Sequence, residues 1–497
     1  MNPFSGALAR TLMARVVVLG AGISGHTAAL VLRRKLGRDH EVVVVSPNRR
    51  WNWIPSNIWV GVGRMRKEDV TFELAPVYRR AHIDYRQAKA VELLPEGTTD
   101  SAAPRVVIEH TSEERRGERE ELAYDYLVNA TGPKLNFAAT AGLGPDGNSL
   151  SVCTFDHAEK TAEALRAAIE RMRAGESLTF VVGMGHGSCT CEGAAFEYVF
   201  NLEFEIRNAG VRDKARIVFL TNEAELGDFG VDGLQIKRGG YVVPSSTFAE
   251  SLFVERGVEW ILGAHVSRVD EHEVSYETLD GEVHSLHFDF AMLLPPFTGV
   301  GLRATDRAGA DITSTLFAPN AFMRVDADYT QKPYDQWKPE DWPKTYQSPL
   351  YRNVFAVGIA FAPPHALSQP RKTKNGTVVA PAPPRTGMPS GIMGRTVALS
   401  IVDMIRHGAD KPTHSAPMSE MGAACVASAG VGFRKGSAVS MTMYPVVPDY
   451  ERYPGLGRDL RHTVGEIGSA GHWIKRLLHH LFLYKARGRF GWWLIPE

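Results

Sequence analysis

Short apolar runs and longer stretches with helical spacing alternate along the first part of this chain. Residues 15–19 form a β-branched run, residues 26–34 place apolar side chains at helical spacing, and residues 41–45 form a second β-branched run. Short apolar runs are typical of buried strands, and the longer pattern is typical of a helix. The strand, helix and strand order predicts an α/β fold built on a parallel sheet.

A glycine-rich turn joins the first strand to the helix. It has the form GxGxxG, with Gly20, Gly22 and Gly25 at the glycine positions and Ser24 between them. In this order of elements, backbone N–H groups and the helix N-terminus hold a pyrophosphate, so we expect a dinucleotide here. A glycine turn without a ligand is the alternative, and the flanking strand and helix argue against it. Where a carboxylate usually binds ribose hydroxyls, about 20 residues further on, Ser46-Pro47 stands and no acid is present.

The same pattern occurs a second time. Its predicted elements are a helix at 155–174, a strand at 177–182, a glycine-rich turn at 183–191, a helix at 194–200, and strands at 216–220 and 288–294. The duplication predicts two tandem Rossmann-like dinucleotide-binding domains.

The second glycine-rich turn carries thiols. Cys189 and Cys191 stand where a phosphate-binding helix is expected to begin, and Thr221-Asn222 replaces the acid that usually ends the next strand. NAD(P)H is therefore disfavoured, although the nearby Glu223 keeps it open. If no hydride arrives from nicotinamide, the cysteines are the natural entry point for electrons. A thiolate released by disulfide exchange can pass an electron pair to a flavin stacked beside it.

Two later strands each end at a glycine. Residues 126–132 contain Thr131 and Gly132, and residues 353–358 end at Gly358. They resemble the two segments that close over FAD in flavin-disulfide reductase-like proteins. The second departs from that pattern, because Ile359 stands where an aspartate is expected.

The length of 497 residues is sufficient for two or three domains. We assign residues 15–150 and 300–400 to a discontinuous FAD-binding domain and 151–299 to a second domain with a degenerate nucleotide site. Residues 401–497 form a C-terminal region. Residues 113–121 are expected to be a solvated turn, and the proline-rich residues 363–384 a loop without regular structure.

Composition excludes several classes of function. Lysine plus arginine equal aspartate plus glutamate, at 56 each, so no nucleic acid partner is expected. No apolar run is long enough for a transmembrane helix, and the first residues are too short for a secretory segment, so export by that route is not expected. Four cysteines do not make a disulfide scaffold, which suggests redox or metal chemistry. No metal site is predicted, because the CxC pair lacks a second pair of ligands.

The tail has an amphipathic pattern. One helical face carries Trp473, Ile474, Leu477, Leu478, Leu481, Phe482 and Tyr484, and the other carries Lys475, Arg476, His479 and His480. Basic amphipathic helices flanked by tryptophan lie in the membrane interface. A helix that packs on the body of the protein or on a dimer partner is the alternative.

Several segments resemble, in order, motifs of the sulfide:quinone oxidoreductases. They are residues 46–48, 53–63, 130–135, 151–159, 191–198 and 423–427. The resemblance implies a membrane-associated FAD enzyme that oxidises sulfide to sulfane sulfur or polysulfide through cysteine persulfides and passes the electrons to quinone. It places the protein peripherally on a bacterial inner membrane, with the side open and a homo-oligomer possible.

The resemblance also implies roles for individual residues. Cys191 and Cys425 match the two sulfur carriers, and Cys153 matches the cysteine beside the flavin, which is covalently linked to it in some members. His157 matches a histidine near that cysteine and is a candidate proton relay, although Asp156-His157 also suits the first turn of a helix. Cys189 is an extra thiol, and a small register error would exchange it with Cys191.

The segments that border the quinone pocket in the family match this sequence less closely than the others do. Its expected residues are Trp53, Pro55, Thr386, Gly387 and Val426. Residues 385–391 differ from the family's KTGYMIE form, and Asp228 stands where relatives have a histidine. The acceptor therefore stays open, and so do three other functions: a type II NADH:quinone-type oxidoreductase, a flavocytochrome-type sulfide dehydrogenase, and a non-catalytic FAD sulfur or redox sensor.

Overall fold

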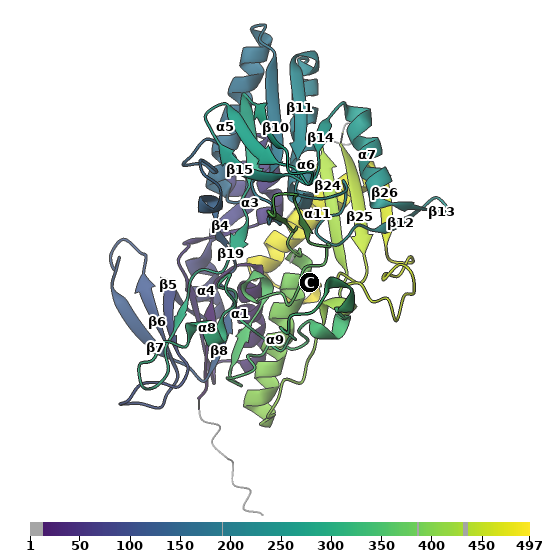
Figure 1. The fold of residues 1–497 in the computed structure, drawn as a ribbon. Coiled ribbons are helices and arrows are strands. Elements are labelled where there is room, and N and C mark those ends of the chain that lie inside the picture. Colours follow the sequence, from purple (N-terminus) through teal and green to yellow (C-terminus); the bar gives the residue numbers. More distant parts are fainter. Residues whose placement is uncertain (1–12, 191, 385–386, 431–435) are drawn as a thin grey trace, which may run out of the picture.

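The computed structural model describes residues 13–190, 192–384, 387–430 and 436–497, and it has the predicted α/β architecture (Figure 1). The first sheet has the strand order β21-β8-β1-β2-β5-β6-β7, with β20 beside β5. In that order the strands are Val354–Ala356, Tyr126–Asn129, Arg15–Leu19, Glu41–Ser46, Asp84–Leu94, Arg105–His110 and Arg119–Ala123, and β20 is Arg303–Ala304. The strands from β21 to β5 are parallel neighbours.

Two helices pack against each other beside this sheet. They are α1 (Ile23–Leu36), which follows the first glycine turn, and α9 (Gly387–His407) from much later in the chain. A β-carbon at Gly394 would lie 2.2 Å from the backbone oxygen of Ser24, so the helices approach where one of them has no side chain. The chain thus returns to its first sheet at β21 and α9.

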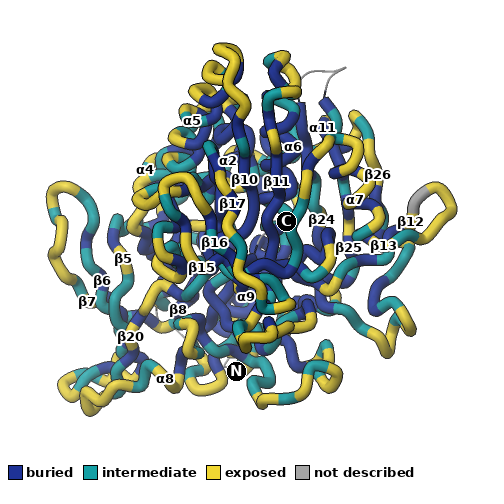
Figure 2. Tube along the Cα trace, turned by 45° about the horizontal axis from the view of Figure 1, so that its top comes forward, coloured by how far each residue is buried: buried dark blue, intermediate teal, exposed yellow. Residues whose placement is uncertain are grey.

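The second glycine turn belongs to a separate parallel sheet. Its strands, in order, are β14 (Glu259–Ile261), β11 (Ala215–Leu220), β10 (Leu178–Met184) and β18 (Phe290–Leu294). Helices α5 (Phe155–Arg173) and α6 (Glu192–Asn208) lie beside it (Figure 1). An antiparallel sheet of β15 (His265–Val269), β16 (Glu273–Glu277) and β17 (Val283–His287) adjoins it. Figure 2 shows the buried course of β10 and β11 through the middle of the molecule.

A third sheet combines two distant parts of the chain. Its order is β13 (Tyr241–Pro244), β12 (Gln235–Arg238), β26 (Val464–Gly468), β25 (Ser437–Met443) and β24 (Ala423–Ala429). Helix α11 (Ser469–Ala486) packs across its C-terminal strands. The domain limits proposed from the sequence stay a prediction.

Two local expectations are wrong. Residues 119–121, assigned to a solvated turn, belong to β7, because Arg119 pairs with Glu109 and Arg105 with Glu121 across neighbouring strands. The proline-rich segment contains a short hairpin of β22 (Arg371–Lys372) and β23 (Val378–Val379). Tertiary contacts order that hairpin: the hydroxyl of Thr377 donates to a Glu277 carboxylate oxygen at 2.7 Å.

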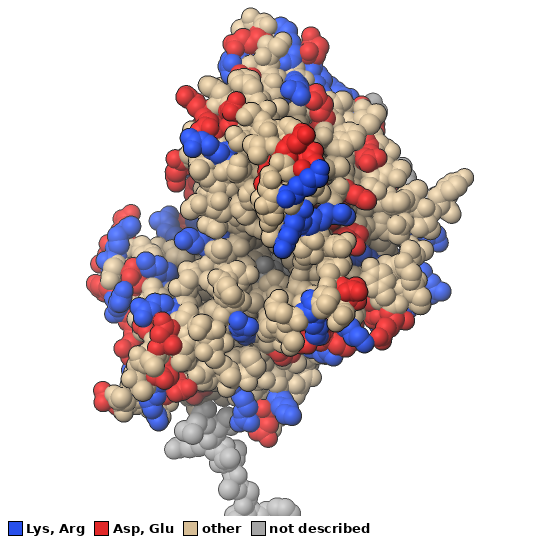
Figure 3. All heavy atoms as spheres, in the orientation of Figure 1, with Lys and Arg blue, Asp and Glu red and all other residues tan. Residues whose placement is uncertain are grey.

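Charges of both signs are interspersed over the face seen in Figure 3, in keeping with the balanced composition. In the described part of the chain, no helix combines the length and the apolar character that crossing a bilayer requires.

Candidate functional site

The first glycine turn is open on one side. Gly20 has a φ of +99°, and a β-carbon at Gly25 would lie 2.1 Å from the oxygen of Gly20, so both positions need glycine. A β-carbon at Gly22 would have no protein atom within 4 Å. Gly22 is the N-cap of α1, so the turn presents the helix N-terminus to that space. This arrangement fits a pyrophosphate, as FAD binding requires.

The other predicted flavin residues lie at the carboxyl ends of neighbouring strands. Ser46 ends β2, and the oxygen of Pro47 accepts from the Thr111 hydroxyl at 3.0 Å. The Thr131 hydroxyl donates to Asn129 at 2.8 Å, just after β8. Gly358 follows β21 with a φ of +66°, and a β-carbon there would lie 2.2 Å from the Ser24 hydroxyl. The residues therefore gather at one edge of the sheet, where open α/β sheets bind ligands. Their individual roles stay a prediction.

The second glycine turn is closed by the protein itself. A β-carbon at Gly183 would lie 1.8 Å from the oxygen of Leu220, and one at Gly185 would lie 2.5 Å from the Leu143 side chain. At Gly187 it would lie 2.8 Å from a ring nitrogen of His265. None of these three glycines has the open side that Gly22 has.

A segment of the proline-rich region covers this turn. We call residues 373–382 the strap. Its Ala380 N–H donates to the oxygen of Gly187 and its Ala382 N–H to the oxygen of Cys189, both at 2.9 Å. The side-chain amide of Asn222 donates to the same two oxygens, at 3.2 and 3.3 Å. A nucleotide pyrophosphate could reach this turn only if the strap moved.

Cys425 lies against the first turn of α6. It stands on β24, and its Sγ is 3.1 Å from the place of a β-carbon at Gly193, the second residue of α6. Cys191 immediately precedes this helix in the sequence and, like Thr386, lies outside the described residues. Strand β24 thus brings Cys425 to the N-terminal end of α6.

The described cysteines are free thiols in desolvated surroundings. Burial and, to a smaller extent, the carboxylate of Glu197 raise the pKa of Cys425 to about 11, against the opposing effect of the Lys475 ammonium. Burial likewise raises the pKa of Cys153 to about 11, against a hydrogen bond with Ser151. With these raised pKa values, both sulfurs are mostly protonated at neutral pH. The thiolate is the reactive form of a cysteine, so these surroundings alone keep both residues mostly in the less reactive form.

The extra thiol, Cys189, is committed to a structural contact. Its side chain is fully buried, and its Sγ donates to the oxygen of Leu294 at 3.1 Å. Burial raises its pKa well above the usual value, and Glu192 adds to the effect. This position favours a packing role for Cys189 and leaves Cys191 as the candidate sulfur carrier.

An ion pair from the tail helix lies beside Cys425. Glu197 of α6 and Lys475 of α11 form a buried salt bridge, and the Lys475 ammonium also donates to the oxygen of Val426 at 2.9 Å. The carboxylate of Glu197 accepts from the N–H of Ser428 at 3.1 Å. The sequence analysis missed this pair. A glutamate within an otherwise apolar helical stretch was the available signal, because a buried charge needs a partner.

His157 lies in the first turn of α5, where its N–H donates to the Thr154 hydroxyl at 3.2 Å. Its ring contacts Phe137 edge to face, with centroids 5.8 Å apart. Its Nδ1 is buried and has no hydrogen-bond partner among the described residues. The helix-cap position accounts for the local sequence, and the relay role stays a prediction.

Of the expected quinone residues, Trp53 lies against the tail helix. Trp53 is stacked against Trp51 at 6.0 Å and against Phe482 of α11 at 4.9 Å. Gly387 begins α9 with Ile23 at 3.3 Å from its β-carbon position. Pro55 and Val426 are half-buried. No contact among the described residues assigns a ligand to them.

Comparisons with known proteins agree with this geometry. A family model described as pyridine nucleotide-disulphide oxidoreductase matches residues 14–332. The sulfide-quinone reductase of Aquifex aeolicus is 30% identical over 95% of this chain and 91% of that protein. The mitochondrial sulfide:quinone oxidoreductase of Mus musculus is 27% identical over 69% of this chain and 64% of that protein.

A comparison with a solved structure agrees with these sequence comparisons. The X-ray structure of the Aquifex aeolicus sulfide:quinone oxidoreductase matches with a TM-score of 0.73 at 28% identity, covering 96% of this chain and 92% of that one. The sequence motifs, the paired glycine turns and these matches agree: this chain belongs to the sulfide:quinone oxidoreductase family of the pyridine nucleotide-disulphide oxidoreductases.

Proposed function

We propose that this protein is a membrane-associated FAD enzyme that oxidises sulfide and reduces a quinone. The observation that carries the proposal is the approach of Cys425 to the first turn of α6, directly after Cys191 in the sequence. A sulfur relay requires two cysteines close together, and the position of Cys425 against the helix that follows Cys191 in the sequence supports this role for the pair. Family membership gives FAD as the cofactor, and the open turn at Gly22 fits its pyrophosphate.

The two cysteines would hold sulfane sulfur between them. Sulfide attacks a bridged sulfur, one sulfur–sulfur bond breaks as another forms, and a thiolate is released. FAD, when bound, supplies a two-electron acceptor that can pass the pair on to quinone. Lys475 favours the released Cys425 thiolate electrostatically, because its ammonium lowers the pKa that burial raises.

The closed second turn supports entry of electrons through sulfur and not through NADH. The strap and Asn222 donate hydrogen bonds to the backbone oxygens of Gly187 and Cys189, and His265 fills the space beside Gly187. A type II NADH:quinone-type function would need this turn open. The described geometry therefore favours sulfide over nicotinamide as the donor.

The tail helix supports membrane contact. Its exposed side chains include Trp473, Ile474, Leu477 and Tyr484, and Phe490 beyond it is 89% exposed. Two of its polar residues face inward: His479 contacts the Ser56 hydroxyl at 2.9 Å, and Lys475 pairs with Glu197. A helix with buried polar residues and exposed apolar ones suits a lipid surface better than the packing alternative. The side of the membrane, a bacterial inner membrane location and a homo-oligomer stay predictions.

Steady-state reduction of decylubiquinone by sulfide tests the function. The wild-type protein should turn over many times, whereas Cys191→Ser and Cys425→Ser should each lose about 100-fold or more of the rate, because each removes a covalent step. Cys189→Ser is the matched control and should keep most of the activity. Reduction of the flavin without turnover would identify a sensor instead, and equal turnover in all three variants would contradict the sulfur relay.

A further inference from the structure

Three buried carboxylates meet around residues 228–230. The Glu223 carboxylate accepts from the N–H of Phe229 at 2.6 Å, and Asp228 accepts from the N–H of Gly230 at 2.9 Å. A carboxylate oxygen of Glu192 lies 3.4 Å from the position of a β-carbon at Gly230. Three successive loop residues thus bring the three acids together.

Glu192 is the unusual member of this group. It is the first residue of α6 and is only 1% exposed, yet neither of its carboxylate oxygens has a hydrogen-bond partner among the described residues. A buried ionised carboxylate without partners is strongly unfavourable, so a proton must be held within the group. Burial and the neighbouring Glu223 raise the pKa of Glu192 well above its usual value, and burial and Asp228 raise that of Glu223 to about 8.

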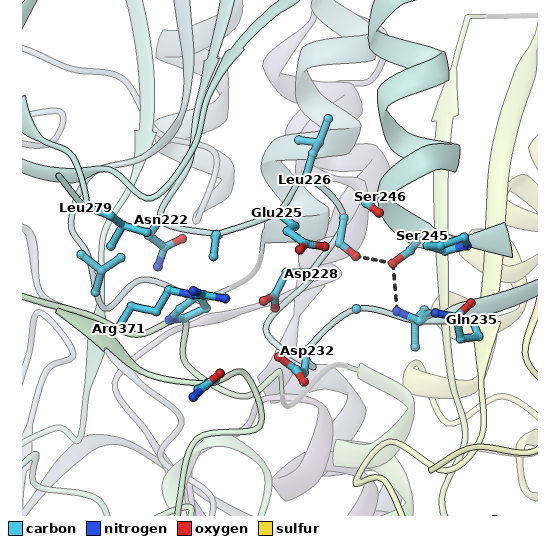
Figure 4. A pocket seen from close by; sticks show the side chains of 18 residues that line it. Asn222, Glu225, Leu226, Asp228, Asp232, Gln235, Ser245, Ser246, Leu279 and Arg371 are labelled. Atoms are coloured by element: carbon cyan, nitrogen blue, oxygen red, sulfur yellow. Dashed lines mark hydrogen bonds between the residues drawn. The ribbon is translucent and has the colours of Figure 1, made fainter. Parts of the chain in front are cut away.

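The three buried acids extend from the start of α6 to a pocket. The pocket has a volume of about 210 Å³, and its lining includes Asn222, Asp228, Asp232 and Arg371 (Figure 4). Asn222 is 1% exposed, and its Oδ1 is buried without a partner. Asp228 belongs both to the buried group and to the pocket wall. At the other end, Glu192 directly follows Cys191 and influences Cys189.

We propose that Glu192, Glu223 and Asp228 form an acid relay that carries protons from the sulfur site to this pocket. The inference rests on the proposed function, because sulfide oxidation is what releases the protons. In the first step the S–H bond of sulfide or of a cysteine breaks and an O–H bond forms on Glu192, which has passed its own proton to Glu223. The electron pair stays on sulfur and later leaves in the two-electron oxidation. Glu223 in turn passes a proton to Asp228, which delivers one to water in the pocket.

The geometry gives each acid a distinct position. Glu192 begins the helix whose next residue lies against Cys425, and it is near enough to Cys189 to raise the pKa of that thiol. Glu223 is fixed by the Phe229 N–H and the Thr221 hydroxyl, and Asp228 reaches the pocket and also accepts from the Ser368 hydroxyl. Carboxyls of raised pKa can exchange protons with thiols, whose pKa values are also high here. An ordinary glutamate would be too weak a base for this transfer.

Glu192→Gln tests the relay, with Glu225→Gln on the exposed pocket rim as the matched control. In anaerobic stopped-flow mixing with sulfide, the flavin of Glu192→Gln should bleach about 100-fold more slowly, the usual size of a lost proton transfer. Added imidazole, a small diffusible base, should restore part of the rate in proportion to its concentration. The control should bleach like the wild type and gain nothing from imidazole. Asp228→Asn should show the same slow, imidazole-dependent bleaching.

Infrared spectroscopy adds a readout that does not depend on activity. The carbonyl band of a protonated carboxylic acid should be present at neutral pH in the wild type and in Glu225→Gln, and weakened in Glu192→Gln. An unchanged band, or a wild-type bleaching rate in a flavin-loaded Glu192→Gln, would overturn the relay. A wild-type protein that sulfide does not bleach would instead refute the proposed function.

Discussion

The two glycine turns of this protein share one order of elements and differ in what surrounds them. The turn at Gly22 leaves open space before the N-terminus of α1, whereas the turn at Gly183 to Gly187 is filled by Leu143, His265 and the strap. The strand, glycine and helix pattern alone therefore does not identify a nucleotide site. Whether such a turn can bind a nucleotide depends on whether distant parts of the chain cover it. Here the turn at Gly22 is open to a cofactor, whereas the turn at Gly183 is covered and carries thiols.

The largest expected effect is on folding, at the closed turn. In Gly183→Ala, the new β-carbon would meet the backbone of Leu220, which cannot move without breaking the β10–β11 pairing. We expect the free energy of unfolding to fall by about 3 kcal/mol, as in severe overpacking. Urea denaturation followed by circular dichroism measures this, and a loss of less than about 1 kcal/mol would contradict the backbone clash.

The open turn should respond through its ligand. Gly22 has a φ of −71° and no atom near its β-carbon position, so Gly22→Val should fold normally. Its side chain would occupy the space assigned to the pyrophosphate, and we expect FAD affinity to fall on the order of 100-fold, equivalent to about 3 kcal/mol. Flavin retained after dialysis gives the affinity, and Gly22→Ala should lose less. Full retention of FAD in Gly22→Val would place the pyrophosphate elsewhere.

A smaller effect is expected where the strap meets the closed turn. Asn222→Ala removes hydrogen bonds to the oxygens of Gly187 and Cys189, which should lower stability by about 1–3 kcal/mol. Lys374→Ala shortens an exposed side chain of the strap and is the control, with an effect within about 0.5 kcal/mol. Thermal unfolding compares the two. Equal shifts would mean that Asn222 does not anchor this turn.

The smallest effect concerns pH and the strap. Hydrogen bonds from Thr373, Thr377 and Asn375 hold the pKa of Glu277 below its usual value. Because the folded pKa is lowered, the stabilisation is present above the unfolded pKa and is lost as pH falls through the folded one. Hydrogen exchange in the strap should therefore speed up on acidification more than the intrinsic rate does. Thr377→Val should reduce this dependence, and an unchanged dependence would assign it to another group.

The sequence predicted the elements better than their contacts. The strand at 15–19 and the helix starting at Phe155 are confirmed, because apolar periodicity and caps are local signals. The strap was not predictable, since its hydrogen bonds join residues 380 and 382 to residues 187 and 189, far away in the chain. The proline content predicted a loop. Where that loop lies is set by the residues of this chain that it contacts, which the sequence does not show.

The candidate site shows the same limit. Family motifs pointed to Cys425, but neither the Glu197–Lys475 pair nor the unpartnered Glu192 could be predicted, because both depend on how helices from separate regions meet. In the tail, periodicity predicted a helix, and its burial does not follow the two predicted faces, because His479 is buried and His480 exposed while Phe482 packs on Trp53. Buried partners decide which polar side chains pack inward, because Glu197 and Ser56 compensate Lys475 and His479.

One measurement tests the difference between the two turns most directly. The absorbance of the bound flavin is followed anaerobically after mixing with sulfide and, separately, with NADH. Sulfide should bleach the flavin rapidly and decylubiquinone should restore its colour, whereas NADH should leave it oxidised because the second turn is closed. Rapid bleaching by NADH, or none by sulfide, would contradict the account.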